Sequence, residues 1–182
     1  MGGRGQPLPL FLCPYTREVT PSVLHIHVSN GGVPKRPVLF GEVTPVGLVG
    51  DHHNHPQIHG GPQKALLIIT SEGLDELKQA GFPVYPGAMG ENITSVGLNR
   101  RMMRLGQRYR IGEVIVELSK MRQPCDALTS YGVGIGKAVF DAHVKAGDPT
   151  SPVWGLAGFY TSVVQTGTIR PGDSIILLEE SV

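Results

Sequence analysis

Cysteine is scarce in this chain of 182 residues, which contains only Cys13 and Cys125. The two lie far apart in the sequence, so at most one intramolecular disulfide is available, and a framework of bridges like that of small secreted domains is excluded. This usage favours a reducing, cytoplasmic environment. The length suits one domain of ordinary size with a hydrophobic core of its own.

An excess of charge of one sign is also missing. Sixteen Lys and Arg residues stand against fifteen Asp and Glu residues, which leaves a formal net charge of +1. A field this weak gives no reason to expect nucleic acid or an anionic membrane as a partner. Long hydrophobic runs are missing as well, since none approaches the roughly 18 apolar residues that span a bilayer. We therefore expect no membrane association.

The beginning of the chain does not read as a signal peptide. Its apolar stretch, Leu8 to Leu12, is interrupted by Pro9, and no small-residue cleavage site follows it. We expect residues 1–20 to be a loosely ordered leader and residues 21–182 to form a single domain. No internal repeat or interdomain linker divides that domain.

Glycine and proline are plentiful, with 25 and 15 residues, and the apolar fraction is 40%. This composition favours a domain rich in turns and strands. Alternating or continuous apolar runs between turn residues predict its strands. They are expected at residues 23–28, 38–43, 65–69, 92–96, 109–111, 113–118, 154–164 and 174–178. In the first of them, Val23, His25 and His27 are expected to share one face.

Two segments have helical spacing. The first spans residues 72–80, with Thr70 or Ser71 as its N-cap and Gly81 as its stop. The second is the region 135–146. Strands and helices do not alternate in the βαβ rhythm of a parallel doubly wound sheet. The sequence therefore predicts a mainly β fold, an antiparallel β-barrel with a few short helices.

The stretch MRQPCDAL, residues 121–128, places Cys125 on a proline-stiffened loop after the apolar run 114–118. Arg122 lies three residues before the thiol, and a nearby guanidinium favours the thiolate form that binds metals or accepts sulfur. Asp126 acts in the opposite direction. The alternative is that Cys125 is a small buried apolar residue, as most free cysteines are.

A polar, glycine-rich segment at residues 50–62 is expected to be a loop. It carries closely spaced imidazoles next to an acidic side chain, and neutral histidine is a common ligand of zinc and nickel. The alternative is that these are polar loop residues that bond the backbone or a ligand, because their spacing matches no closed metal site. The group consists of Asp51, His52, His53, His55 and His59.

Two further stretches are candidates for binding an anion. In the stretch 59–64, HGGPQK, Gly60 and Gly61 let backbone N–H groups approach a phosphate while Lys64 supplies a charge. Its spacing is not that of a Walker loop, and a dinucleotide glycine fingerprint is missing from the whole chain. In GEN, residues 90–92, Asn92 is a candidate for hydrogen-bonding a phosphate, and Glu91 is a candidate for supporting the loop. The alternative for each stretch is an ordinary turn before a strand.

Four of these stretches together resemble one family. In chain order they read GDHHNHPQIHGGPQKAL, PGAMGENIT, LGQRYRIGEVIVELSKMRQPC and WGLAGFYTSVVQTGTIRPGDSI. Their succession, across about residues 23 to 180, closely resembles the MOSC domain, named for the C-terminal domain of molybdenum-cofactor sulfurases. The resemblance implies a β-rich barrel of the pyruvate-kinase-barrel type with short helices.

The resemblance also implies the cofactor and the residues that hold it. The cofactor is molybdopterin, with Cys125 in the position of the cysteine that ligates molybdenum in related reductases. The implied cofactor-binding residues are Lys35 (the weaker candidate, for the phosphate), His59, Gly60, Gly61, Lys64, Asn92 (for the pterin or its phosphate) and Arg122 (beside the thiolate). The family often has an acidic residue where this chain has His55, and a glutamine near His53, so no role is copied onto that loop.

Two functions are implied. The first is an oxidoreductase that reduces a small N-hydroxylated substrate, because the chain resembles the standalone bacterial members that detoxify N-hydroxylaminopurines. Its electrons would come from a separate electron-transfer protein, since the chain has too few cysteines for its own Fe–S cluster and no flavin or NAD fingerprint. The alternative is a sulfur carrier or cofactor-delivery module, with a persulfide on Cys125 and a separate sulfur donor.

Overall fold

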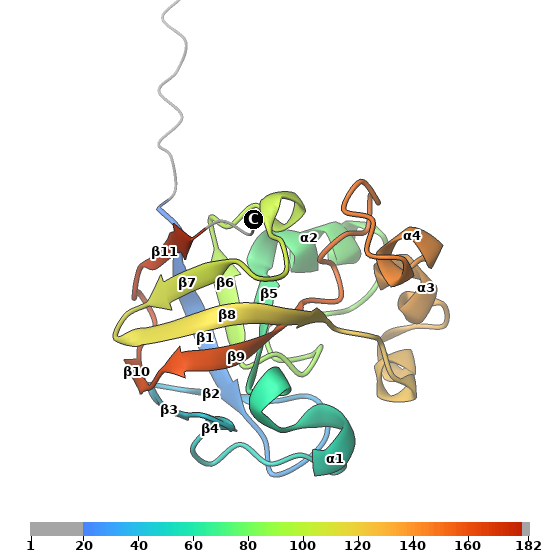
Figure 1. The fold of residues 1–182 in the computed structure, drawn as a ribbon. Coiled ribbons are helices and arrows are strands. Elements are labelled where there is room, and N and C mark those ends of the chain that lie inside the picture. The colour runs from blue at the N-terminus through green and yellow to red at the C-terminus, as the bar shows by residue number, and fades with distance from the viewer. Residues whose placement is uncertain (1–19, 180–182) are drawn as a thin grey trace, which may run out of the picture.

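The structure is a computed structural model in which residues 20–179 are described. The predicted leader, residues 1–20, and Cys13 therefore lie almost wholly outside the described residues. The described chain folds into an eight-stranded and a three-stranded sheet with short helices around them (Figure 1).

The larger sheet has the strand order β11-β7-β8-β9-β5-β6-β1-β2, and the smaller one β10-β3-β4. The strands of the larger sheet are β1 (Ser22–Val28), β2 (Arg36–Val38), β5 (Leu66–Thr70), β6 (Ile93–Val96), β7 (Arg108–Ile111), β8 (Val114–Met121), β9 (Phe159–Gln165) and β11 (Ile175–Glu179). Those of the smaller sheet are β3 (Gly41–Thr44), β4 (Gly47–Leu48) and β10 (Gly167–Ile169). The helices are α1 (Pro56–His59), α2 (Ser71–Gln79), α3 (Ile135–Val139) and α4 (Ala142–Lys145), with 3-10 turns η1 (Pro62–Lys64), η2 (Arg100–Met102) and η3 (Asp126–Tyr131).

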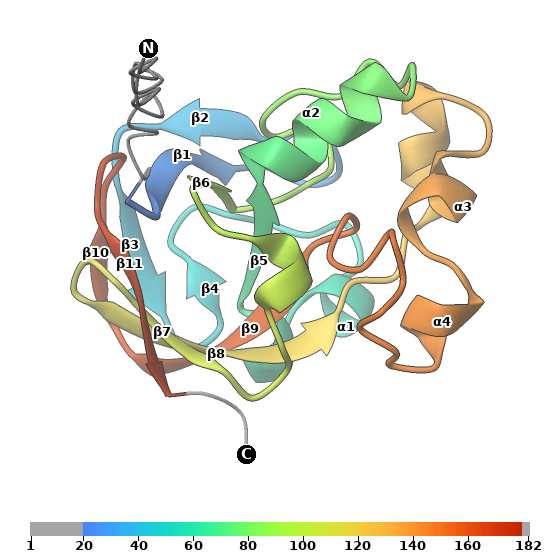
Figure 2. The ribbon, with the colours of Figure 1, turned by 90° about the horizontal axis from the view of Figure 1, so that it is seen from above.

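Strand pairing is antiparallel throughout the described residues, except between β5 and β6. The strands curve around a common interior (Figure 2). The starts of β1 and β11 are linked, because the Val23 N–H donates to the Asp173 carbonyl and the Ile175 N–H to the Pro21 carbonyl. The mainly β class is confirmed. The eight-stranded sheet begins with β11 and ends with β2, which are not paired with each other within residues 20–179, so the closed barrel stays a prediction.

The core has two parts. The larger cluster fills the interior of the curved sheets, with Phe159, Ile26 and Leu66 among its fully buried side chains. The second lies between β5 and the helices, where Leu74 and Leu77 of α2 pack with Ile135 and Val139 of α3. Figure 2 shows α2, α3 and α4 together on one side of the molecule. The apolar spacing of residues 72–80 therefore predicts the buried face of α2 correctly.

Two predicted strands are wrong in their extent. The segment 38–43 is not one strand, because β2 ends at Val38 and β3 begins at Gly41, with Leu39 and Phe40 exposed between them. The segment 154–164 becomes strand only at Phe159. Before it, Gly155 and Gly158 have positive φ angles of 76° and 92°, which makes residues 154–158 a turn.

The helical regions also differ from expectation. Residues 135–146 form two helices, because Phe140 is extended and the Asp141 side chain caps α4 by accepting from the Val144 N–H at 2.8 Å. The predicted loop 50–62 contains α1, and β10 lies between the predicted strands 154–164 and 174–178.

The predicted alternation of β1 is interrupted. A bulge shifts its register against β6 between Val23 and His25. Of the three residues expected on one face, Val23 and His27 are buried and His25 is only half-buried. The bulge, which adds a residue to one strand, explains why a strict period of two fails here.

None of the helices within residues 20–179 is long and apolar enough to cross a membrane.

The N-cap of α2 yields a first prediction. The Thr70 hydroxyl accepts from the Gly73 N–H at 3.1 Å, whereas the Ser71 hydroxyl contacts only Glu72 on the surface. We expect Thr70→Ala to lower the free energy of unfolding by about 1 kcal/mol, since the cap bond is lost. Ser71→Ala is the matched control and should change it little. Urea denaturation checks both, and equal effects of the two substitutions would contradict the assignment of the cap.

Candidate functional site

One cavity of about 360 Å³ gathers side chains from elements that are far apart in the sequence. It is lined by the turn before β2, the segment that leads into α1, η1, β5, the turn before β6, the end of β8, the start of η3, and β9. Six of the predicted site residues line it together: Lys35, His59, Lys64, Asn92, Arg122 and Cys125. Gly60 and Gly61 are not among the lining residues.

Cys125 reaches the cavity because β8 ends just before it. The last bond of this strand region is donated by the Arg122 N–H to the Gly158 carbonyl, at 3.0 Å. Pro124 follows, and Cys125 has extended backbone angles at the N-cap of η3. Its thiol is half-buried and forms no disulfide within residues 20–179. The interpretation of Cys125 as a sealed core residue is therefore wrong.

Arg122 lines the same cavity as Cys125 and is buried, with an exposed fraction of 4%. Its Nη2 donates to the Met89 carbonyl at 3.1 Å, but its Nη1 has no hydrogen-bond partner among the described residues. A buried donor without a partner costs about 1–3 kcal/mol, and more when the group is charged. The guanidinium therefore has an unmet capacity for an acceptor.

Lys64 and Tyr160 form another part of the wall. The Lys64 Nζ lies 5.8 Å from the centroid of the Tyr160 ring. Burial raises the pKa of the Tyr160 hydroxyl, and the charge of Arg122 partly opposes this. Sequence reasoning missed Tyr160 as a site residue, although it lies in the stretch WGLAGFYTSVVQTGTIRPGDSI that carries the family resemblance.

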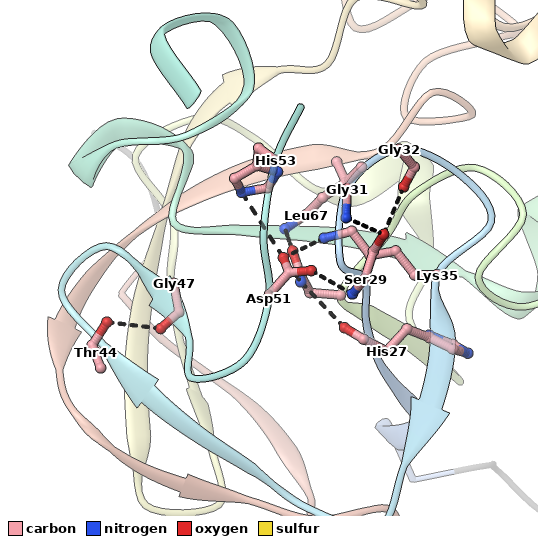
Figure 3. A network of polar contacts seen from close by, with 11 residues as sticks. His27, Ser29, Gly31, Gly32, Lys35, Thr44, Gly47, Asp51, His53 and Leu67 are labelled. Atoms are coloured by element: carbon pink, nitrogen blue, oxygen red, sulfur yellow. Dashed lines mark hydrogen bonds and ion pairs between the residues drawn. The ribbon is translucent and has the colours of Figure 1, made fainter. Parts of the chain in front are cut away.

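Asp51 is the centre of a polar network (Figure 3), and two of its partners, Lys35 and Asn92, line the cavity. Its Oδ2 binds the Lys35 Nζ at 2.5 Å and accepts from the Asn92 Nδ2 at 2.8 Å. Its Oδ1 accepts from the Ser29 N–H at 2.8 Å. The side chains of Lys35 and Asp51 are only 5% and 3% exposed. Lys35 thus reaches the cavity with its charge already balanced.

Asn92 is used by the protein itself. Its Oδ1 accepts from the Leu67 N–H at 3.1 Å, and its Nδ2 donates to the His27 carbonyl at 3.3 Å as well as to Asp51. These bonds join β5, β1 and the Asp51 segment. Asn92 therefore fixes the wall of the cavity, and most of its hydrogen-bonding capacity is spent there.

Glu91 supports the neighbouring turn, as predicted. Its Oε1 accepts from the Gly87 N–H at 2.6 Å and from the Thr94 hydroxyl at 3.0 Å. Burial raises the pKa of this carboxyl, and the two hydrogen bonds oppose the shift. The turn held in this way carries Met89 and Gly90, which line the cavity.

The histidines of residues 52–59 do not meet as a metal site. Among the described residues, no group of three or more His, Cys, Asp or Glu side chains is arranged to hold a metal ion. His53, His55 and His59 line the cavity, whereas His52 is exposed. The described residues therefore give no zinc or nickel centre in this segment, which leaves the alternative of polar loop histidines.

Comparisons with known proteins place these residues in context. The sequence profile of the MOSC domain matches residues 55–176. "Uncharacterized protein YflK" of Bacillus subtilis is 31% identical over 121 residues, which cover 66% of this chain and 50% of that protein. A protein of Gibberella moniliformis named "Reductase" is 30% identical over 138 residues, 73% of this chain and 23% of that protein.

A solved structure gives the same picture of the fold. YiiM from Geobacillus stearothermophilus superposes with a TM-score of 0.63 at 28% identity, over 87% of this chain and 75% of that one. The chain spans half or less of the length of the curated relatives it matches.

The buried pair of Lys35 and Asp51 yields a second prediction. Asp51→Ala leaves a buried ammonium without its counter-charge and removes the acceptor for Ser29 and Asn92. We expect the free energy of unfolding to fall by about 3–5 kcal/mol. The control is Asp75→Ala, which breaks the exposed ion pair with Lys78 and should cost at most about 1 kcal/mol. Chemical denaturation measures both, and similar losses would contradict the role of Asp51.

Proposed function

The chain belongs to the MOSC domain family, and from this premise we propose that it binds the molybdenum cofactor and reduces N-hydroxylated compounds. The observation that carries the proposal is that Cys125 and the buried Arg122 line one cavity together with Lys64 and His59. A soft sulfur ligand suits molybdenum, and cationic donors suit the cofactor's phosphate.

The residues present fit the cofactor. Arg122 lines the cavity, and its guanidinium is a cationic donor that pairs well with the oxygens of a phosphate. Lys64 adds a second positive charge to the same cavity. Lys35 and Asn92 are tied to Asp51, so in this proposal they shape the wall and Arg122 and Lys64 hold the anion. Gly60 and Gly61 would act only through the turn that places Lys64.

Each polar residue has a distinct part in this proposal. When bound, the cofactor supplies two-electron redox chemistry at molybdenum. Cys125 ligates the metal from the N-cap of η3, a position fixed by the end of β8. Leu67, Met89 and Tyr160 line the cavity with apolar surface that limits water around the reacting group. The electrons come from a separate electron-transfer protein.

A relative named "Reductase" matches 73% of this chain, in a stretch that makes up 23% of that protein, and its name is compatible with this function. The runner-up is a sulfur carrier in which Cys125 holds a persulfide. It is favoured by one observation, the half-buried thiol that opens onto a cavity large enough for a small donor. A cytoplasmic location fits both functions and stays a prediction.

Cofactor loading is the first test. After expression in a host that makes the cofactor, the purified protein should contain about one molybdenum and one pterin per chain. Arg122→Gln should lower both contents several-fold, because it removes the buried cationic donor. Arg110→Gln, on the exposed face of β7, is the matched control. Wild-type protein without molybdenum and pterin would refute the cofactor proposal.

Cys125→Ser tests the chemistry. With a supplied electron donor and N-hydroxylaminopurine as substrate, we expect the loaded wild type to form the amine and Cys125→Ser to lose at least about 100-fold in rate, because the soft metal ligand is removed. Circular dichroism controls for folding. Loaded protein that shows no reduction, while mass spectrometry finds sulfane sulfur on Cys125, would favour the sulfur carrier instead.

A further inference from the structure

His53 combines two features that the other imidazoles of its segment do not share. It lines the cavity that contains Cys125. Its Nε2 also faces a buried carboxylate, at 3.9 Å from the Asp51 Oδ2 (Figure 3). His59 lines the cavity too, but among the described residues no carboxylate lies within ion-pair distance of it.

Asp51 is a rigid partner for this imidazole. Its three short contacts, with the Ser29 N–H, the Lys35 ammonium and the Asn92 amide, come from separate segments of the chain. The carboxylate therefore cannot turn away without breaking bonds to them. At 3.9 Å this carboxylate is too far for a hydrogen bond, but its charge favours the tautomer with the proton on Nε2 and stabilises the imidazolium electrostatically. Nδ1 is then the nitrogen left for a ligand in the cavity.

The surroundings of His53 lower the pKa of its imidazolium. Burial lowers its pKa from the ordinary value of 6.5, the Lys35 ammonium lowers it further, and Asp51 raises it. His59 and His52 also face it and lower its pKa. An imidazolium in this setting gives up its proton readily, and the neutral ring regains one from solvent, since the His53 side chain is 22% exposed.

We propose that His53 is a catalytic proton donor in this cavity and that Asp51 is its positioning residue. The inference rests on the proposed reductase function. Reduction of an N-hydroxylated base breaks the N–O bond, takes two electrons from the electron-transfer protein and takes up two protons. One proton ends on nitrogen, and the other converts the departing hydroxyl into water. His53 supplies the proton for the departing oxygen and is reprotonated from solvent.

The kinetic test compares His53→Gln with His52→Gln, the exposed neighbour in the same segment. We expect His53→Gln to lower kcat on the order of 10²-fold, with KM and molybdenum content unchanged. In the wild type, kcat should rise as the pH falls through the His53 pKa, below 6.5. This limb should be missing in His53→Gln and present in His52→Gln.

A second readout needs neither cofactor nor turnover. Nitrogen-detected NMR of the apo protein, with the His53 signals assigned by their loss in His53→Gln, reports the tautomer and the titration midpoint. We expect the neutral ring to carry its proton on Nε2, toward Asp51, and to titrate below pH 6.5. A ring protonated on Nδ1, or one that titrates at or above 6.5, would contradict the pairing.

The possible results distinguish the proton-donor role of His53 from the proposed reductase function. If His53→Gln reduces substrate at the wild-type rate and with the wild-type pH profile, the proton donor is refuted and the reductase stands. If His53→Gln loses its molybdenum, the residue binds cofactor, and the proton role is refuted. A loaded wild type that reduces nothing would overturn the proposed function, and the proton donor with it.

Discussion

The contact between Asp51 and Lys35 is the constraint on which the cavity depends. A carboxylate and an ammonium with almost no access to water cost several kcal/mol to desolvate, so they persist only where further hydrogen bonds compensate for them. Here the Asn92 amide and the Ser29 N–H supply those bonds. The pair thereby joins three segments that would otherwise be separate surface turns. One wall of the cavity is the result.

Another part of the cavity lining has a different physical character. The Arg122 guanidinium donates to the Met89 carbonyl, and its Nη1 has no partner among the described residues. Cys125 lines the same cavity from the N-cap of η3. One wall thus has its charges balanced internally, while the other offers a cation and a soft nucleophile. A ligand with an anionic end and a thiophilic centre satisfies this asymmetry, and the molybdenum cofactor has both.

Much of this arrangement follows from the sequence, because local patterns determine it. The cap and apolar spacing of α2 and the continuous apolar run of β5 predict those elements directly. The candidate residues around Cys125 and Lys64 follow from motif chemistry and from the resemblance to the MOSC domain. That these residues meet in one cavity depends on tertiary structure. From the sequence, only the resemblance to the MOSC domain predicts it.

The rest depends on contacts that no local pattern records. Asp51 finds Lys35 at a separation of 16 residues and Asn92 at 41, so its structural role is invisible in the segment of histidines beside it. Tyr160 enters the cavity only because β9 pairs with β5 and β8. The break of residues 135–146 into two helices follows from one capping carboxylate, Asp141, which outweighs the apolar spacing on either side.

The ligation of molybdenum by Cys125 is the central claim, and X-ray absorption spectroscopy of the loaded protein tests it most directly. The account predicts that the first shell of molybdenum in the wild type contains one sulfur more than in Cys125→Ser, with the same pterin content in both. An identical sulfur count in the two proteins would contradict it.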